Sequence, residues 1–208
     1  MFKGNKIYIV DKNGKRRRIF GFIKGLNIRF KGKNSVVEIH EPIARFSKCK
    51  IRVSDNSFVS IGGSTDIIKK LHINGASNQN FIIGKDFFTW GCDIATANEK
   101  GLSIKIGDNC MFSRDILIRA SDGHSVIDKD TKEVLNFGKN ITIGNDVWIA
   151  GNVAILKGVN IGDGSIIGHG SIVTKDCESF CAYAGNPAKL IKRNVTWKRE
   201  SPENYISS

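Results

Sequence analysis

The sequence predicts an all-β protein built as a parallel β-helix, a coil of short strands stacked along one axis. Three observations lead to this prediction: a high share of β-branched residues, many glycines with few prolines, and a six-residue repeat. Of the 208 residues, 30 are Ile and 12 are Val, while 22 are Gly and 3 are Pro. Because β-branched residues favour strands and glycine permits tight turns, this composition suits strands joined by repeated corners.

The repeat is clearest in the C-terminal half of the chain. An aliphatic residue stands at every sixth position in the series Ile143, Ile149, Ile155, Ile161, Ile167 and Val173. A second series of small or β-branched residues follows four positions later, at Val147, Val153, Val159, Ser165, Ser171 and Cys177. A period of six matches neither a helix nor simple strand alternation, and a β-sandwich predicts irregular spacings. It matches strands that turn a corner every six residues, three to a coil, with the aliphatic residue pointing inward.

The N-terminal half predicts a hairpin followed by less regular coils. Segment 1–25 is basic, and within it Ile7–Phe20 predicts a hairpin whose turn is Asn13-Gly14. Segment 26–105 predicts longer, irregular coils of the same solenoid. The similar turn phrases behind this prediction begin at Gly32, Ser54, Gly84 and Gly107.

The regular coils are predicted for 106–180, with one interruption. An earlier block with the same period, Ile106 to Ile118, is one residue out of phase with the series that starts at Ile143. The polar, turn-rich stretch 120–140 between them predicts a loop ejected from the coil, and loops on rigid scaffolds often carry function. The C-terminal segment 181–208 is basic and predicts a short helix after Pro187 or a loose tail.

Charge and cysteine content limit the function. The chain has 32 Lys and Arg against 20 Asp and Glu, a formal net charge of +12, which predicts an anionic partner. We expect no nucleic acid, because no motif for its recognition is present. We expect no membrane span and no secretory signal, because no apolar run is long enough. The five cysteines include no CxxC pair, which predicts reduced core thiols in a cytoplasmic protein, without disulfides or a metal.

Among the histidines, His124 is the best candidate for chemistry. It follows the phrase Ser121-Asp122-Gly123 at the mouth of the ejected loop, and an imidazole near a carboxylate suits a general base. His169 lies at a corner of the regular coils, where it would be exposed to a ligand. His40 and His72 lie in the N-terminal coils without a metal-ligand cluster, which favours structural roles.

Trp148 and a basic group are the other candidates. Trp148 should point outward beside the place where the loop returns, either to bind a ligand or to pack against the loop. The basic group at the end of the coils consists of Lys175, Lys189, Lys192 and Arg193. Such a group is either a solvated face or a set of point charges that captures phosphate.

Together these features resemble the hexapeptide-repeat acyltransferases over about 104–193. The phrases that carry the resemblance are the hexads, the loop with His124, IGNDVWI at 143–149 and AGNPAK at 184–189. More narrowly, the chain resembles bacterial capsule O-acetyltransferases of the polysialic-acid type. That likeness rests on IRASDGH at 118–124, the 24-residue step from His124 to Trp148, IKRNVTWKR at 191–199 and, more weakly, LNIRFKG at 26–32.

The resemblance implies a left-handed β-helix assembled as a homotrimer, with active sites in clefts between neighbouring prisms. It implies transfer of acetyl from acetyl-CoA, without a metal, to a sugar hydroxyl in a bacterial surface glycan. A capsular polysaccharide that contains sialic acid is the expected acceptor, and its acidity would match the positive charge. Peripheral association with a membrane is compatible with what the resemblance implies.

By the same resemblance, His124 is the base that takes the proton from the acceptor hydroxyl in a direct ternary complex. Trp148 is expected beside the reacting groups. The residues expected to contact the cofactor are Trp148, Gly151, His169, Thr174, Lys175, Lys189 and Lys192. The residues expected on the acceptor side are Asp115, Arg119 and Asp122, of which Asp122 would orient the loop or the histidine. Asp115 replaces an asparagine of the galactoside branch, which argues against a neutral galactoside acceptor.

Two alternatives stay open. The same fold also serves acetyl transfer to an amino sugar or to a xenobiotic such as an antibiotic. A non-enzymatic β-solenoid could instead bind an anionic polymer through its charge. A purely structural solenoid, however, has no need of a loop carrying Asp-Gly-His or of the phrase Gly-Asn-Pro-Ala-Lys after the last coil.

Overall fold

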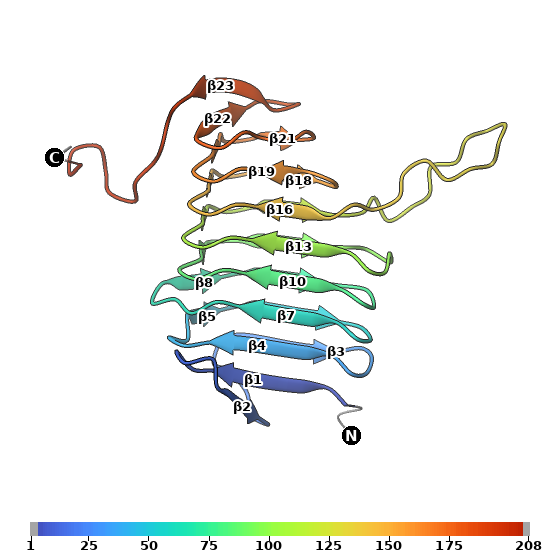
Figure 1. The fold of residues 1–208 in the computed structure, drawn as a ribbon, viewed down its shortest axis with the longest axis vertical. Coiled ribbons are helices and arrows are strands. Elements are labelled where there is room, and N and C mark those ends of the chain that lie inside the picture. Colours follow the sequence, from blue (N-terminus) through green and yellow to red (C-terminus); the bar gives the residue numbers. More distant parts are fainter. Residues whose placement is uncertain (1–3, 206–208) are drawn as a thin grey trace.

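A computed structural model describes residues 4–205, which form a three-sided prism of stacked β-coils (Figure 1). Its 23 strands make three sheets of eight, eight and seven strands. The described residues contain no helix, and therefore none that could cross a membrane. The all-β solenoid predicted from the repeat is confirmed.

The chain passes through the three sheets in turn, one strand per sheet in each coil. The first sheet contains β1 (Lys6–Val10), β2 (Arg16–Ile19), β4 (Val36–His40), β7 (Phe58–Ile61), β10 (Asn80–Ile83), β13 (Ser103–Ile106), β16 (Ile141–Ile143) and β19 (Asn160–Ile161). The second contains β5 (Arg45–Ser47), β8 (Ile67–Lys69), β11 (Phe88–Thr89), β14 (Met111–Phe112), β17 (Trp148–Ile149), β20 (Ile166–Ile167), β22 (Cys181–Ala184) and β23 (Lys189–Arg193). The third contains β3 (Leu26–Phe30), β6 (Cys49–Val53), β9 (Leu71–Asn74), β12 (Cys92–Ala95), β15 (Ile116–Arg119), β18 (Ala154–Leu156) and β21 (Ile172–Val173).

The six-residue repeat forms the core as predicted. All six members of the series from Ile143 to Val173 are at most 2% exposed, and the second series is buried as well. Ile143 lies opposite Ile161, 18 residues on, so one coil equals three hexads. In the N-terminal half, Val37 lies opposite Val59, 22 residues on. These earlier coils use strands of up to five residues where the hexad coils use two or three, which hides the six-residue period.

A hairpin lies at each end of the stack. β1 pairs antiparallel with β2 and places Ile7 opposite Ile19, which confirms the hairpin predicted around Asn13-Gly14. At the other end, the short helix considered after Pro187 is wrong, because β23 pairs antiparallel with β22. β22 is the last strand of the stack, and its free backbone groups can be satisfied by a returning strand but not by a helix.

The terminal segments predicted as 1–25 and 181–208 extend beyond the described part of the chain. Their outermost residues, 1–3 and 206–208, lie outside the described residues.

The ejected loop is present where the phase of the repeat breaks. Residues 120–140 leave the prism after β15, extend sideways and return at β16 (Figure 1). Ile104 lies opposite Ile141, a step of 37 residues instead of 18, so the loop adds 19 residues to one coil. The far part of the loop is narrow, with an antiparallel bridge between Ile127 and Val134.

The five cysteines are free and buried, which confirms the prediction of core thiols. Burial raises the pKa of Cys110 to about 12 and that of Cys177 also to about 12. These thiols therefore stay protonated at neutral pH and are poor nucleophiles.

The corner between the first and second sheets, here called the glycine corner, requires glycine for a steric reason. Gly84, Gly107 and Gly144 stack there in successive coils. A Cβ atom on Gly84 would lie 2.5 Å from the carbonyl carbon of Gly107, and one on Gly107 would lie 2.6 Å from that of Gly144. The glycine corner therefore lets successive backbones approach more closely than any side chain would allow.

We predict that Gly107→Ala destabilises the prism, because its Cβ would collide with backbone that is fixed by strand pairing. The expected loss is about 2 kcal/mol or more in the free energy of unfolding, measured by urea denaturation followed by circular dichroism. Gly21→Ala is the matched control, since nothing lies within 4 Å of its Cβ. Equal stability of the two variants would contradict the close approach at this corner.

Candidate active site

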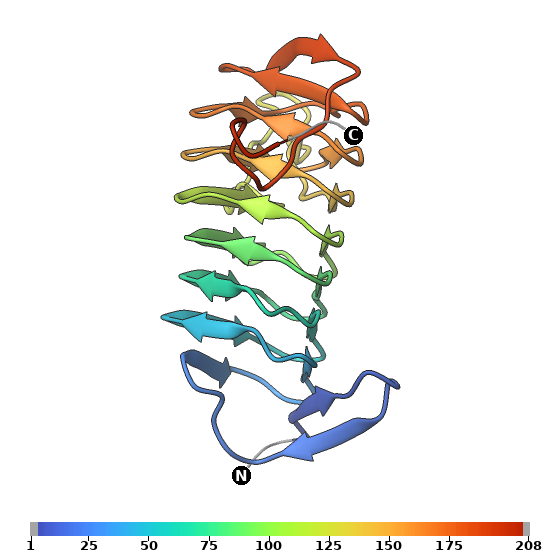
Figure 2. The ribbon, with the colours of Figure 1, turned by 90° about the vertical axis from the view of Figure 1, so that its left-hand side faces the viewer.

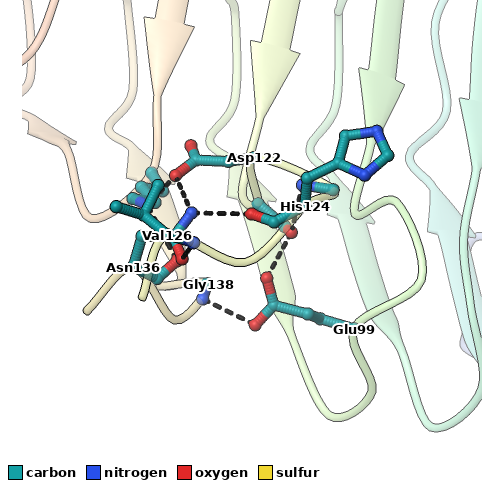
Figure 3. A network of polar contacts seen from close by, with 9 residues as sticks. Glu99, Asp122, His124, Val126, Asn136 and Gly138 are labelled. Atoms are coloured by element: carbon teal, nitrogen blue, oxygen red, sulfur yellow. Dashed lines mark hydrogen bonds and ion pairs between the residues drawn. The ribbon is translucent and has the colours of Figure 1, made fainter. Parts of the chain in front are cut away.

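The root of the ejected loop holds the main chain of His124 in place. The Asn136 side-chain amide donates hydrogen bonds to the His124 carbonyl oxygen at 2.8 Å and to Asp122 Oδ2 at 2.7 Å. Its own oxygen accepts a hydrogen bond from the Val126 N–H at 2.7 Å. The His124 side chain is exposed, and its ring points away from these contacts (Figure 3). An exposed imidazole on an anchored backbone is free to meet a reactant.

Asp122 is bound by Lys157, which follows β18. Its carboxylate pairs with Lys157 Nζ and accepts the Asn136 hydrogen bond, and these two contacts lower its pKa. Lys157 also donates to the Asn136 carbonyl oxygen at 2.9 Å. Two roles were predicted for Asp122, and these contacts favour the one in which it orders the loop.

Glu99 clamps the loop from the preceding coil. One of its carboxylate oxygens accepts a hydrogen bond from Ser121 Oγ, and the other accepts the Gly138 N–H at 2.6 Å (Figure 3). Gln79 in turn donates to the Glu99 carbonyl oxygen at 2.8 Å. Both arms of the loop are thus fixed to the corner between the third and first sheets, which is called the loop corner below.

A groove of about 470 Å³ lies at the corner between the second and third sheets, here called the groove corner. Three residues predicted from the sequence line it together, namely Asp115, Gly151 and His169. A Cβ atom on Gly151 would lie 3.1 Å from His169 Nδ1, so the glycine leaves room for the imidazole. The Asn152 side-chain amide lies 3.2 Å from His169 Nε2.

Earlier coils complete this groove with residues that sequence analysis did not single out. Lys69 Nζ lies 4.5 Å from the centre of the Trp90 ring, which is 48% exposed. Lys70 and Arg114 add two more cations. The groove is therefore basic and aromatic, a combination suited to anionic or sugar-containing ligands.

Trp148 lies on the outward face of the second sheet in a row with Lys192. Trp148 lies opposite Ile166, Ile166 opposite Ala182, and Ala182 opposite Lys192. Adjacent strands are about 4.8 Å apart, so the backbones of Trp148 and Lys192 are about 14 Å apart. One face therefore carries a predicted cleft residue and a predicted phosphate-binding residue.

The ring contact of Trp148 is with the C-terminal segment. Its ring centre lies 6.2 Å from that of Trp197, and the Trp197 indole N–H donates to the Asp146 carbonyl oxygen at 2.5 Å. The ejected loop, which was the packing partner predicted for Trp148, leaves the prism at the loop corner instead. Figure 2 shows this segment descending from β23 over the coils at that end.

Arg199 fastens the same segment to lower coils. Its guanidinium pairs with Asp66 and donates to the Asp86 carbonyl oxygen at 2.9 Å. The segment 194–199 therefore spans several coils along the glycine corner. Neither Trp197 nor Arg199 was assigned a role from the sequence.

The other predicted residues lie in three places. Thr174 and Lys175 follow β21 at the loop corner, and both are exposed. Lys189 joins Lys192 in β23. Arg119 is the last residue of β15 and is exposed.

One chain does not bring these groups into a single site. Asp115 precedes β15 and the loop follows it, so the groove and the loop root lie at opposite ends of that strand. Four strand residues alone span about 13 Å. Trp148 lies on yet another face, in the second sheet. Within one chain, His124 therefore lies apart from both the groove and Trp148.

Comparisons with known proteins identify the family and the fold. Residues 140–175 match the family model described as bacterial transferase hexapeptide (six repeats). The chain is 33% identical to the polySia-specific acetyltransferase NeuO, whose crystal structure matches with a TM-score of 0.76 over 97% of this chain and 82% of that one. The polysialic acid O-acetyltransferase OatWY is 23% identical and shares the fold, with a TM-score of 0.68 over 98% of this chain and 92% of that one.

A further relative is the polysialic acid O-acetyltransferase of Escherichia coli O1:K1 / APEC. It is 44% identical over 135 residues, which are 65% of this chain and 43% of the relative. The matched part therefore spans less than half the length of that curated relative.

The chain belongs to the hexapeptide-repeat acyltransferases, and its prism is the left-handed β-helix of that family. Within the family it is similar to the polysialic acid O-acetyltransferases, as its motifs indicated.

We predict that Asn136→Ala frees the loop, because it removes three hydrogen bonds that join the two arms. Amide hydrogen exchange across 121–138 should become faster, while the hexad coils keep their protection. Glu133→Ala, in the far part of the same loop, is the control and should leave exchange at the loop root unchanged. Unaltered exchange in the Asn136 variant would show that other contacts suffice.

Proposed function

We propose that the chain is an acetyl-CoA-dependent O-acetyltransferase that modifies a sugar hydroxyl in a bacterial surface glycan. The observation that carries this proposal is the exposed His124 imidazole on a loop anchored by Asn136, Glu99 and Lys157. The 33% identity to a polySia-specific acetyltransferase over nearly the whole chain supports the same reaction class. It also supports a capsular polysaccharide containing sialic acid as the acceptor.

His124 acts as the general base. Its imidazole accepts the proton of the acceptor hydroxyl while the hydroxyl oxygen attacks the thioester carbonyl carbon of acetyl-CoA. The tetrahedral intermediate then expels the CoA sulfur, which takes the proton back from His124, and the sugar ester is released. Histidine can accept and return a proton near neutral pH, and a positioned base contributes about 10²–10⁴ in rate.

The outer faces of the prism carry side chains that suit the parts of acetyl-CoA. Lys189 and Lys192 offer exposed ammonium groups for its phosphates. Gly151 and His169 in the groove, with Thr174 and Lys175 at the loop corner, are proposed to line its pantetheine arm. Trp148 is proposed to contact the reacting end, which requires that its partner Trp197 leave or share that face.

The acceptor side is proposed to involve Asp115 and Arg119. Both are exposed; Asp115 directly precedes β15 and Arg119 is its last residue. An Arg guanidinium can pair with a sugar carboxylate through two parallel hydrogen bonds. Asp122 is already paired with Lys157, so its contribution is to hold the loop in its binding shape.

We propose a homotrimer in which the loop corner of one copy faces the second sheet of its neighbour. The separation of His124 from Trp148 within one chain supports this assembly, because a closed ring of three copies would bring the two surfaces together three times. Five reduced, buried cysteines support a cytoplasmic protein.

We predict that His124→Ala lowers acetyl transfer by about 10²–10⁴. The assay is release of CoA thiol from acetyl-CoA with an α2,8-linked sialic acid oligomer as acceptor and maltose as the neutral comparison. The control is His72→Ala, a histidine in an earlier coil that is hydrogen-bonded to Asp93 at 2.9 Å and should leave the rate unchanged.

Mass spectrometry of the product separates an O-acetyl ester from an N-acetyl amide. Full acceptor-dependent turnover by an assembled His124→Ala variant would contradict its role as base. No turnover of wild type with any sugar hydroxyl would contradict the proposed reaction.

A further inference from the structure

The net charge of the chain is concentrated at one end of the prism. The first 50 residues contain 14 Lys and Arg against 3 Asp and Glu, so they carry +11 of the total +12. The remaining 158 residues contain 18 basic and 17 acidic residues and are nearly neutral. Of these, residues 4–50 form the β1–β2 hairpin and the beginning of the stack, opposite β22 and β23 (Figures 1 and 2).

This charge lies away from the proposed acetyl-transfer site. The loop with His124 leaves from β15, which is four strands beyond β3 in the third sheet. Four strand spacings amount to about 19 Å along the prism axis. The residues proposed to bind CoA, between 148 and 192, lie further still from the hairpin. The basic end therefore lies apart from the residues proposed to carry out acetyl transfer.

The same end exposes two large aromatic side chains between β2 and β3. Phe22 is 90% exposed and Phe20 is 70% exposed. Phe22 and Ile23 line two hollows of about 870 and 630 Å³, and Ile19 lines the smaller one as well. Exposed aromatic side chains beside apolar hollows form a patch that favours a partner over water.

Basic side chains lie on the same end of the prism as these phenylalanines. The Arg18 guanidinium lies 4.8 Å from the centre of the Phe20 ring. Arg16 is paired with the buried carboxylate of Glu38 at 2.7 Å. Four further cations of this end have no ion-pair partner among residues 4–205: Lys12, Lys15, Arg17 and Lys24.

We propose that this end of the prism docks on an anionic lipid surface. Phe20 and Phe22 would enter the boundary between headgroups and acyl chains, and the surrounding cations would contact the anionic headgroups. Aromatic residues combined with Lys and Arg are the composition of interfacial membrane anchors. A soluble anionic glycan would be attracted by the same charge, but it leaves the two exposed phenylalanines and the Ile-lined hollows without a role.

Docking through the hairpin end leaves the loop that carries His124 accessible to a soluble acceptor. The ejected loop leaves the side of the prism several coils away from the hairpin end (Figure 1), and the groove extends along the groove corner from Lys69 to His169. Acetyl transfer to a soluble acceptor therefore does not depend on docking, and the two proposals fail independently.

The test is flotation of the full chain with lipid vesicles. We expect binding to phosphatidylcholine vesicles that contain about one third phosphatidylglycerol, no binding to phosphatidylcholine alone, and weakening by high salt. The double variant Phe20→Ser/Phe22→Ser keeps the charge and should lose about tenfold or more in partitioning.

Two charge variants distinguish the effect of where a cation lies from the effect of the net charge of the chain. Arg17→Glu/Lys24→Glu should lose binding to the same degree. Lys100→Glu/Lys105→Glu makes the same change in net charge in the middle of the stack and should keep most of the binding. The phenylalanine variant should acetylate a soluble sialic acid oligomer at the wild-type rate, provided that the proposed reaction is correct.

Several results would overturn lipid docking. One is failure of the wild type to bind the phosphatidylglycerol vesicles. Another is equal binding by the phenylalanine variant. A smaller assembly for that variant in sedimentation velocity would show that a second copy of the chain covers the patch. Binding of a soluble sialic acid oligomer that requires Arg17 and Lys24 but neither phenylalanine, without vesicle binding, would assign the end to a glycan.

Discussion

Parallel backbone pairing between successive coils is the constraint on which the rest of this structure depends. It fixes the strand spacing, so each coil must repeat the shape of the one before it, with one aliphatic column inside each face and glycines where backbones almost touch. The interior is then filled by Ile and Val side chains and has no room for a substrate. Chemistry is confined to corners, outer faces and the single loop that leaves the coil.

The sequence predicted those features that repeat at a constant offset. The hexads are visible because pairing from β16 to β21 joins residues 18 apart, and the loop is visible because it breaks that phase. The contacts that anchor His124 repeat nowhere: Glu99 meets Ser121 and Gly138 across 22 and 39 residues. The C-terminal segment is a stronger case, since Trp197 and Arg199 contact residues 51 and 133 positions away. Such contacts leave no periodic signal.

The solenoid also separates its tasks along the axis. The nearly neutral coils after residue 50 present the loop, the groove and the row from Trp148 to Lys192, whereas the basic N-terminal end presents Phe20 and Phe22. Because each coil contacts chiefly its neighbours, one end can acquire a binding surface without disturbing the other. The net charge is thus explained by the hairpin end more than by the anionic cofactor proposed for the other.

A site shared between copies has a direct signature in mixed assemblies. His124→Ala and Trp148→Ala, each inactive by itself, would be co-expressed with different tags and purified as mixed trimers. If the loop of one copy serves the second sheet of its neighbour, one of the three sites in every mixed trimer contains both native residues, and about one third of wild-type turnover returns. No single chain in these trimers carries both native residues, so any recovered turnover must come from a site shared between two chains. Mixed trimers without recovered turnover would contradict a shared site.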